Sequence, residues 1–176
     1  LPAEETCPNA TESCKKYCYA KKAERMYPSV KACRATNYAL SLRQDFVAKM
    51  TKKIEGFISK KTWKNDTVYF RIHESGDFYS IEYFRKWIEI AKKFPNIHFL
   101  AYTKSFQFYD EVKKEIPSNF VVRASIWWDT KPQDLGIIER NNMPFFTALR
   151  KEELEEQVKA NKLYKCVGDC QKCKVC

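Results

Sequence analysis

Seven of the eight cysteines in this 176-residue chain lie in two dense groups near its ends. The groups are Cys7, Cys14 and Cys18, within TCPNATESCKKYCYA, and Cys166, Cys170, Cys173 and Cys176. Closely spaced thiolates are typical metal ligands, and four of them in one short run favour an iron–sulfur cluster. A zinc site, which usually pairs two knuckles across a longer loop, is the second interpretation. A disulfide framework ranks third, because the chain shows no secretory signal.

The first cysteine group supplies three thiolates, whereas a cubane cluster has four irons. Either Cys33 completes the ligand set, or one iron stays open to a small molecule. A fully ligated cluster can carry electrons or stabilise the fold, while an open iron can bind a substrate or S-adenosylmethionine. Cys33 can also be an ordinary buried thiol. Of these, we favour Cys33 as the fourth ligand.

The positive charge of the chain is concentrated in one segment. The sequence has 32 Lys and Arg against 22 Asp and Glu, a net charge of +10, and residues 12–64 alone account for an excess of ten. Such a field attracts polyanions, which predicts nucleic acid or another polyanion as a partner of residues 12–64. The alternative is a solvated helix face.

Hydrophobic periodicity predicts the elements that must position these residues. A helical segment over 12–27 is followed by a long helix over 36–60, capped by Thr36 or Asn37. Strands and helices then alternate. The predicted strands are 68–74, 97–103, 120–127 and 143–149, and the predicted helices are 81–94, 106–116, 132–140 and 152–162, with a polar connection at 61–66. Repeated βα units with apolar strands predict an α/β fold with a parallel sheet.

Polar residues gather at the carboxyl ends of the predicted strands, where such folds place their sites. The catalytic candidates are His73, Glu74, Asp77, Lys104 and Arg123, and the cofactor-binding candidates are Ser75, Gly76, Tyr102 and Ser125. Carboxylates can hold a substrate amine or hydroxyl, and the two cations can bind an anionic group. His73 can transfer protons because its reference pKa lies near neutrality, or it is a structural histidine.

Three segments of the chain carry a resemblance to a known family. CPNATESCKKYCYAKKA, RIHESGDFYS and FLAYTKS resemble the phage "gene product eighty-eight" family, over about Thr6 to Thr147 and on into the C-terminal cysteines. The resemblance implies a phage or prophage origin and a role in the cytoplasm of a bacterial host cell.

A more distant resemblance connects the chain with radical S-adenosylmethionine enzymes. Cys18-Tyr19-Ala20 is similar to the end of their cysteine loop, and Glu74-Ser75-Gly76-Asp77 to their glycine-rich motif. This resemblance implies a partial, open TIM-like barrel, 4Fe-4S clusters and S-adenosylmethionine as a cofactor. The chain departs from the pattern in the spacing of its N-terminal cysteines and in its small number of strands.

These observations predict a single domain over 1–176, made of three parts. Residues 1–66 form a cysteine loop with basic helices, residues 67–163 form the βα repeats, and residues 164–176 form a C-terminal cluster-binding tail. No apolar run approaches the ~20 residues of a membrane span, so no membrane partner is expected.

The predicted function is that of a phage-type iron–sulfur protein with two 4Fe-4S clusters and a radical-enzyme-like partial barrel, which acts on or binds nucleic acid. One alternative is a non-catalytic iron–sulfur redox or binding module. The other is a zinc-stabilised nucleic-acid-binding protein, in which the basic helix docks on phosphates.

Overall fold

The fold is built on a parallel sheet of four strands in sequential order, β1-β2-β3-β4. The computed structural model describes residues 1–59, 67–160, 162–163 and 165–166. The strands are β1 (Val68–Arg71), β2 (Ile97–Thr103), β3 (Phe120–Trp127) and β4 (Phe145–Ala148). The predicted α/β class with a parallel sheet is therefore confirmed.

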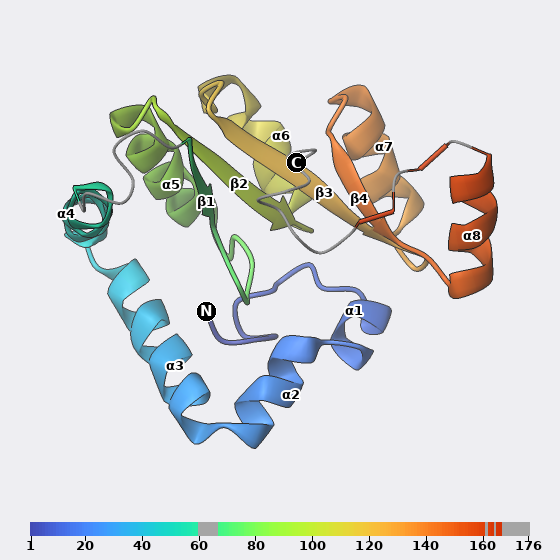
Figure 1. Ribbon diagram of the computed structural model, residues 1–176, viewed down its shortest axis with the longest axis horizontal. Helices are drawn as coiled ribbons and strands as arrows, with labels where there is room; N and C mark the ends of the chain where they lie inside the picture. The colour runs from blue at the N-terminus through green and yellow to red at the C-terminus, as the bar shows by residue number, and fades with distance from the viewer. Residues whose placement is uncertain (60–66, 161, 164, 167–176) are drawn as a thin grey trace.

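Helices connect the strands and precede them. The helices are α1 (Glu12–Lys16), α2 (Tyr19–Met26), α3 (Pro28–Leu42), α4 (Phe46–Ile58), α5 (Ile81–Lys93), α6 (Phe106–Val112), α7 (Pro132–Arg140) and α8 (Lys151–Lys159). Figure 1 shows α5, α6 and α7 on one face of the sheet, with α3 and α4 beyond the β1 edge and α8 beyond β4. No helix among the described residues has the length and apolar character that a bilayer span requires.

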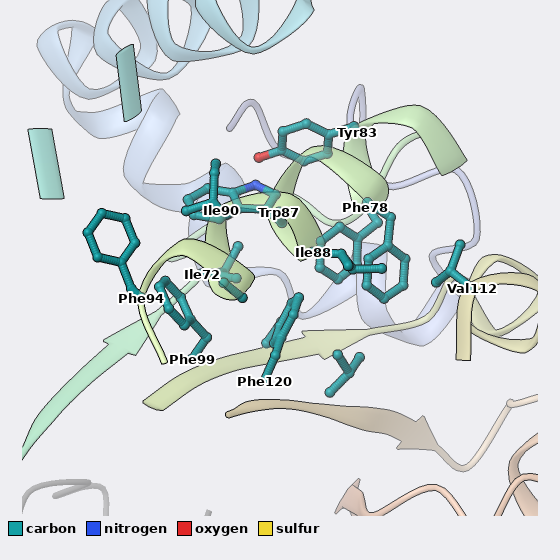
Figure 2. Packing of buried hydrophobic residues seen from close by; sticks show 14 of the residues in the cluster. Ile72, Phe78, Tyr83, Trp87, Ile88, Ile90, Phe94, Phe99, Val112 and Phe120 are labelled. Atoms are coloured by element: carbon teal, nitrogen blue, oxygen red, sulfur yellow. The ribbon is translucent and has the colours of Figure 1, made fainter. Parts of the chain in front are cut away.

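The core lies between α5 and the helix-covered face of the sheet (Figure 2). Alternate residues of β2 and β3 are buried there, among them Phe99 and Phe120. Phe78 stacks on Phe84 of α5 with ring centroids 3.8 Å apart. The intervening strand residues are exposed or half-buried, so the opposite face of the sheet is more open.

The prediction of one long helix over 36–60 is wrong. The chain forms α3 and α4 with a break between them, where Arg43 adopts an extended conformation and pairs with Asp45 at 2.8 Å. Thr36 and Asn37 lie inside α3 and therefore do not cap its N-terminus. The helix begins at Pro28, whose fixed φ suits the first helical turn. The sequence does not indicate this break between α3 and α4, because the apolar residues keep a helical spacing across it.

The later elements are close to their predicted bounds. β2, β3 and α7 match them, whereas β1 and β4 are shorter than predicted. β1 ends early because the chain turns at His73, which has a positive φ of 64°. Helix α6 stops at Val112 and continues as a 3₁₀ turn over Lys113–Glu115. The polar connection predicted at 61–66 lies outside the described residues.

Ser80 caps α5 as predicted, because its Oγ accepts a hydrogen bond from the Tyr83 N–H at 3.2 Å. Ser80→Ala is expected to lower the free energy of unfolding by about 1 kcal/mol, since the cap satisfies one of the free N–H groups of the first turn. Urea denaturation measures the change. Exposed Ser118 provides the control, and Ser118→Ala should change stability by less than about 0.5 kcal/mol. Equal effects of the two substitutions would contradict the capping role.

Candidate functional site

The N-terminal cysteine loop lies over the carboxyl ends of three consecutive strands (Figure 1). After β1, the Asp77 N–H donates to the Thr6 carbonyl at 3.0 Å. After β2, the Ser105 hydroxyl accepts from Asn9 Nδ2 at 3.2 Å. After β3, an Asp129 carboxylate oxygen accepts from the Ser13 N–H at 2.7 Å. The carboxyl edge of a parallel sheet is the usual place for a site, and here the cysteine loop covers it.

Gly76 allows this loop to approach closely. Its φ is +84°, and a Cβ at this position would lie 2.4 Å from Thr6 Oγ1. Any other residue would therefore clash with the cysteine loop as well as strain the backbone. The structure gives Gly76 a packing role; its predicted part in cofactor binding stays a prediction.

Asp77 connects the turn after β1 to the end of β2. Its Oδ1 accepts hydrogen bonds from the Phe78 N–H and the Thr103 hydroxyl, and its Oδ2 accepts one from the Lys104 N–H, each at 2.7 Å. Burial raises the pKa of Asp77 to about 6, and the donated hydrogen bonds oppose that shift. At neutral pH the carboxylate is ionised and positions the loop.

Lys104 lies beneath the cysteine loop and reaches across to β3. Its Nζ donates to the carbonyl and the hydroxyl of Ser125, at 2.7 and 2.8 Å, and lies 5.5 Å from the ring centroid of Trp127. Burial lowers the pKa of Lys104, while the nearby Cys14 and Asp77 act in the opposite direction. Three of the predicted residues, Asp77, Lys104 and Ser125, are therefore brought together.

The three thiols of the loop lie in the same region. Burial, followed by the charge of Asp77, raises the pKa of Cys7 to about 12, and Cys14 and Cys18 contribute to this shift. Burial also raises the pKa of Cys14, against the effect of Lys104. Cys7, Cys14 and Cys18 are thus within electrostatic range of one another, and all three are free thiols.

These thiols do not converge on one point. Within the described ranges, no three His, Cys, Asp or Glu side chains are arranged to share a metal ion. A cubane cluster does not require several thiolates around one metal ion, because each thiolate binds a different iron. Cluster binding by these three cysteines therefore stays a prediction.

The remaining predicted metal ligands are placed elsewhere or are not described. Cys33 is exposed on α3, and Asn37 Nδ2 lies 3.7 Å from its sulfur. It lines a cavity next to β1, and Cys7, Cys14 and Cys18 are not part of the lining of that cavity. Its role as a fourth ligand stays a prediction. Cys166 is exposed, while Cys170, Cys173 and Cys176 lie outside the described residues.

His73 lies against the rings of Phe78 and Tyr83. Its Nε2 lies 3.1 Å from the Tyr83 hydroxyl. Burial lowers the pKa of His73 to about 3, so the imidazole is neutral at physiological pH. The predicted part of His73 in proton transfer stays a prediction.

Glu74 and Ser75 make contacts that stabilise the fold around the site. Both carboxylate oxygens of Glu74 accept from Arg34 Nη2, at 2.9 and 2.8 Å, and its carbonyl accepts from the Tyr19 hydroxyl. Ser75 is buried, and its carbonyl accepts from the amino group of Leu1 at 3.0 Å. Arg34 is buried and also binds Glu24 at 2.9 Å; sequence reasoning missed it, since its helix reads as an ordinary basic segment.

Tyr102 and Arg123 are paired in register on β2 and β3, on the more open face of the sheet. The Arg71 guanidinium lies 5.2 Å from the Tyr102 ring centroid, and Phe146 contacts the same ring edge-on. The two residues precede Lys104 and Ser125 along their strands, so they continue the candidate site along this face.

A basic groove borders the cysteine loop. It is lined by Lys15, Lys16, Lys21, Lys22 and Arg25 together with Tyr17, Cys18 and Tyr19, and has a volume of about 660 Å³. Tyr17 and Tyr19 are 59% and 60% exposed. The sequence predicted the basic charge, but not that it would concentrate around Cys18.

Two tryptophans extend the aromatic surface beside this groove. Tyr17 stacks on Trp127 with centroids 6.3 Å apart and meets Trp128 edge-on at 5.9 Å. Trp128 is 43% exposed. Aromatics at strand ends are more often core residues, and Trp128 departs from that expectation because it follows the last residue of β3 at the surface.

Comparison with known proteins points to one phage family. A family model described as gene product 88 matches residues 1–176. A Gene 88 protein of Mycobacterium phage D29 is 34% identical over 103 residues, which cover 56% of this chain and 42% of the relative. A Gene 88 protein of Mycobacterium phage L5 is 33% identical over 103 residues, 56% of this chain and 43% of the relative. The match thus spans less than half the length of these relatives. No solved structure matches.

Proposed function

The chain belongs to the gene product 88 family, and from its cysteine loop we propose that it is a phage iron–sulfur protein that binds nucleic acid beside its N-terminal cluster. One observation carries the proposal: the loop with Cys7, Cys14 and Cys18 covers the carboxyl edge of the sheet, and Cys18 also lines the basic groove. A cluster in this loop would lie next to a bound polyanion.

In this proposal Cys7, Cys14 and Cys18 would hold a 4Fe-4S cluster, and its fourth iron would stay open, because Cys33 lines a cavity that none of these three cysteines lines. Such a cluster would supply electron transfer or an open coordination position for a ligand such as S-adenosylmethionine. Asp77 and Lys104 would stabilise the strand ends beneath the loop, through the hydrogen bond from the Lys104 N–H to Asp77 and that from Lys104 Nζ to Ser125. A second cluster is assigned to Cys166, Cys170, Cys173 and Cys176.

The finer fold that we propose is an open, TIM-like partial barrel. Four parallel strands in sequential order, with the connecting helices on one face, are arranged as consecutive βα units of a barrel are. In a barrel, the other face of the sheet points inward, and Tyr102 and Arg123 lie on that face.

Single-stranded nucleic acid fits the chemistry of the basic groove. Lysine and arginine side chains can neutralise successive phosphates, and bases can stack on exposed aromatic rings such as Tyr17 and Trp128. Lys16 already lies 5.5 Å from the Tyr17 ring centroid, so a cation and a stacking surface are presented together.

A non-catalytic iron–sulfur binding module is the second candidate, and the contacts of the acidic residues favour it. The oxygens of Asp77 accept three hydrogen bonds, and those of Glu74 are bound by Arg34. The buried Asp77 carboxylate is therefore not available to a substrate without rearrangement, whereas the Glu74 side chain, already paired with Arg34, is 69% exposed. Cleavage of S-adenosylmethionine by the anaerobic protein would exclude this second, non-catalytic candidate.

Iron and sulfide per chain, measured on anaerobically purified protein, test the cluster assignment. We expect about eight irons and eight sulfides, as two cubane clusters require. The triple substitution Cys7→Ser, Cys14→Ser and Cys18→Ser is expected to halve both values. Cys33→Ser is the matched control, and it should leave them unchanged if the fourth iron is open.

Other outcomes would overturn parts of the proposal. Colourless protein with bound zinc and no sulfide would replace it with a zinc-stabilised nucleic-acid-binding protein. If Cys33→Ser lost as much iron as the triple variant, Cys33 would be a cluster ligand. The fourth iron would then have no open coordination position.

A further inference from the structure

We propose that a second cavity, between the α3–α4 arm and the edge strand β1, binds a small organic anion that carries an aromatic ring system. The cavity has a volume of about 500 Å³, within the usual range of small-molecule sites. It is separate from the cysteine loop, and the proposal does not rest on the presence of a cluster.

The inner wall of the cavity is aromatic. Phe46, Phe70, Tyr83 and Trp87 all line it. The Trp87 ring is 5.8 Å from Phe46 and 5.9 Å from Phe70, and Phe46 is 5.9 Å from Tyr83, measured between centroids. Tilted and edge-on rings at these distances form an apolar enclosure that favours a flat aromatic ligand.

Two residues of the cavity lining, His73 and Trp87, have a buried side-chain nitrogen without a hydrogen-bond partner among the described residues. His73 lines the cavity, and while its Nε2 is near the Tyr83 hydroxyl, its Nδ1 is buried without a hydrogen-bond partner among the described residues. Buried polar groups are nearly always hydrogen-bonded in folded proteins. A polar group of a bound ligand would satisfy Nδ1 once a shift of neighbouring side chains exposed this atom, which is closed to solvent, to the cavity.

The charge of the lining favours an anion. Lys49, Lys53 and Arg71 are exposed around the cavity. Lys49 pairs with Asp45 at 2.9 Å, and the Arg71 guanidinium lies over the Tyr102 ring on the open face of the sheet, whereas Lys53 forms no ion pair within the described part of the chain. Glu74, the one acidic residue of the described lining, is already bound by Arg34. The field at the opening is therefore positive.

Titration with 8-anilinonaphthalene-1-sulfonate, an aromatic anion that fluoresces in apolar surroundings, tests the inference. We expect saturable binding that 2-naphthoate displaces and that the uncharged 2-naphthalenemethanol displaces far less well. Lys53→Gln should weaken binding about threefold at low salt, since one charge near the ligand is lost. Lys52→Gln, which removes an exposed charge outside the cavity, is the matched control.

A cavity-filling substitution provides the second measurement. Met50 lines the cavity, and Met50→Trp should abolish binding of the probe while the thermal unfolding curve stays cooperative. Probe binding that is insensitive both to Met50→Trp and to Lys53→Gln would overturn the proposal, because the probe would then occupy another apolar surface. Equal displacement by the acid and the alcohol would overturn its anionic part.

Discussion

Asp77→Ala is expected to lower the free energy of unfolding by about 3 to 5 kcal/mol, which for a domain of this size is a large share of the total. The substitution removes the acceptor of three short hydrogen bonds and leaves the Phe78 N–H, the Thr103 hydroxyl and the Lys104 N–H buried without it. Each unsatisfied donor costs about 1 to 3 kcal/mol. Urea denaturation of protein without added metal measures the loss.

Two further variants separate the carboxylate from the volume of the side chain. Asp77→Asn keeps the shape and one acceptor oxygen but directs an amide N–H₂ at one of the donors, so an intermediate loss is expected. Asp134→Asn removes the charge of a half-buried carboxylate in the first turn of α7, which accepts only from Gln107 among the described contacts, and should change stability by less than about 1 kcal/mol. If Asp77→Ala resembled Asp134→Asn, the network would not organise the strand ends.

Neutralising three cations of the basic groove is expected to weaken binding of a single-stranded oligonucleotide by about 100-fold at low salt. Lys16, Lys22 and Arg25 line the groove and form no ion pair within the described ranges, so their charges are available to phosphates. The triple variant to glutamine should also make the slope of log K against log salt shallower by about 2, because each phosphate contact contributes about 0.7. Fluorescence anisotropy at several salt concentrations gives both values.

The matched control removes the same charge elsewhere. Lys31, Lys52 and Lys53 are exposed on α3 and α4 and do not line the groove. Their conversion to glutamine lowers the net charge equally, and we expect a loss of binding of less than about fivefold. Similar losses in the two triple variants would mean that only the overall charge attracts nucleic acid, and the groove would not be the site.

The sheet could be predicted because the sequence of each strand shows a hydrophobic pattern that is typical of strands. β2 and β3 follow alternating or continuous apolar patterns bounded by prolines, and both were found at their predicted bounds. The break between α3 and α4 could not be predicted in the same way. Leu42 and Phe46 are spaced as on one helix, yet Leu42 is 57% exposed, because the chain turns at Arg43 and Asp45.

Proximity at the site could be predicted, but not the chemistry of each residue. Carboxyl ends of parallel strands meet at one edge, so the sequence correctly grouped Asp77, Lys104 and Ser125. The low pKa of His73 depends on burial under α5, and the partners of Glu74 come from a helix 40 residues earlier in the chain. Such tertiary contacts leave no local pattern in a single sequence.

The cysteine loop is synthesised before the strand ends that it binds, because a chain is made from its N-terminus. The loop can therefore attach to the sheet only late in synthesis. Asn9 and Ser13 bind Ser105 and Asp129, which lie 96 and 116 residues farther along the chain. At about 5 to 20 residues per second, the ribosome needs roughly 6 to 23 seconds to complete these docking points after the loop has been made. During that interval Cys7, Cys14 and Cys18 have no folded surface to cover them. If the chain holds the proposed cluster, cluster assembly before Asp129 has been synthesised would therefore act on an undocked segment.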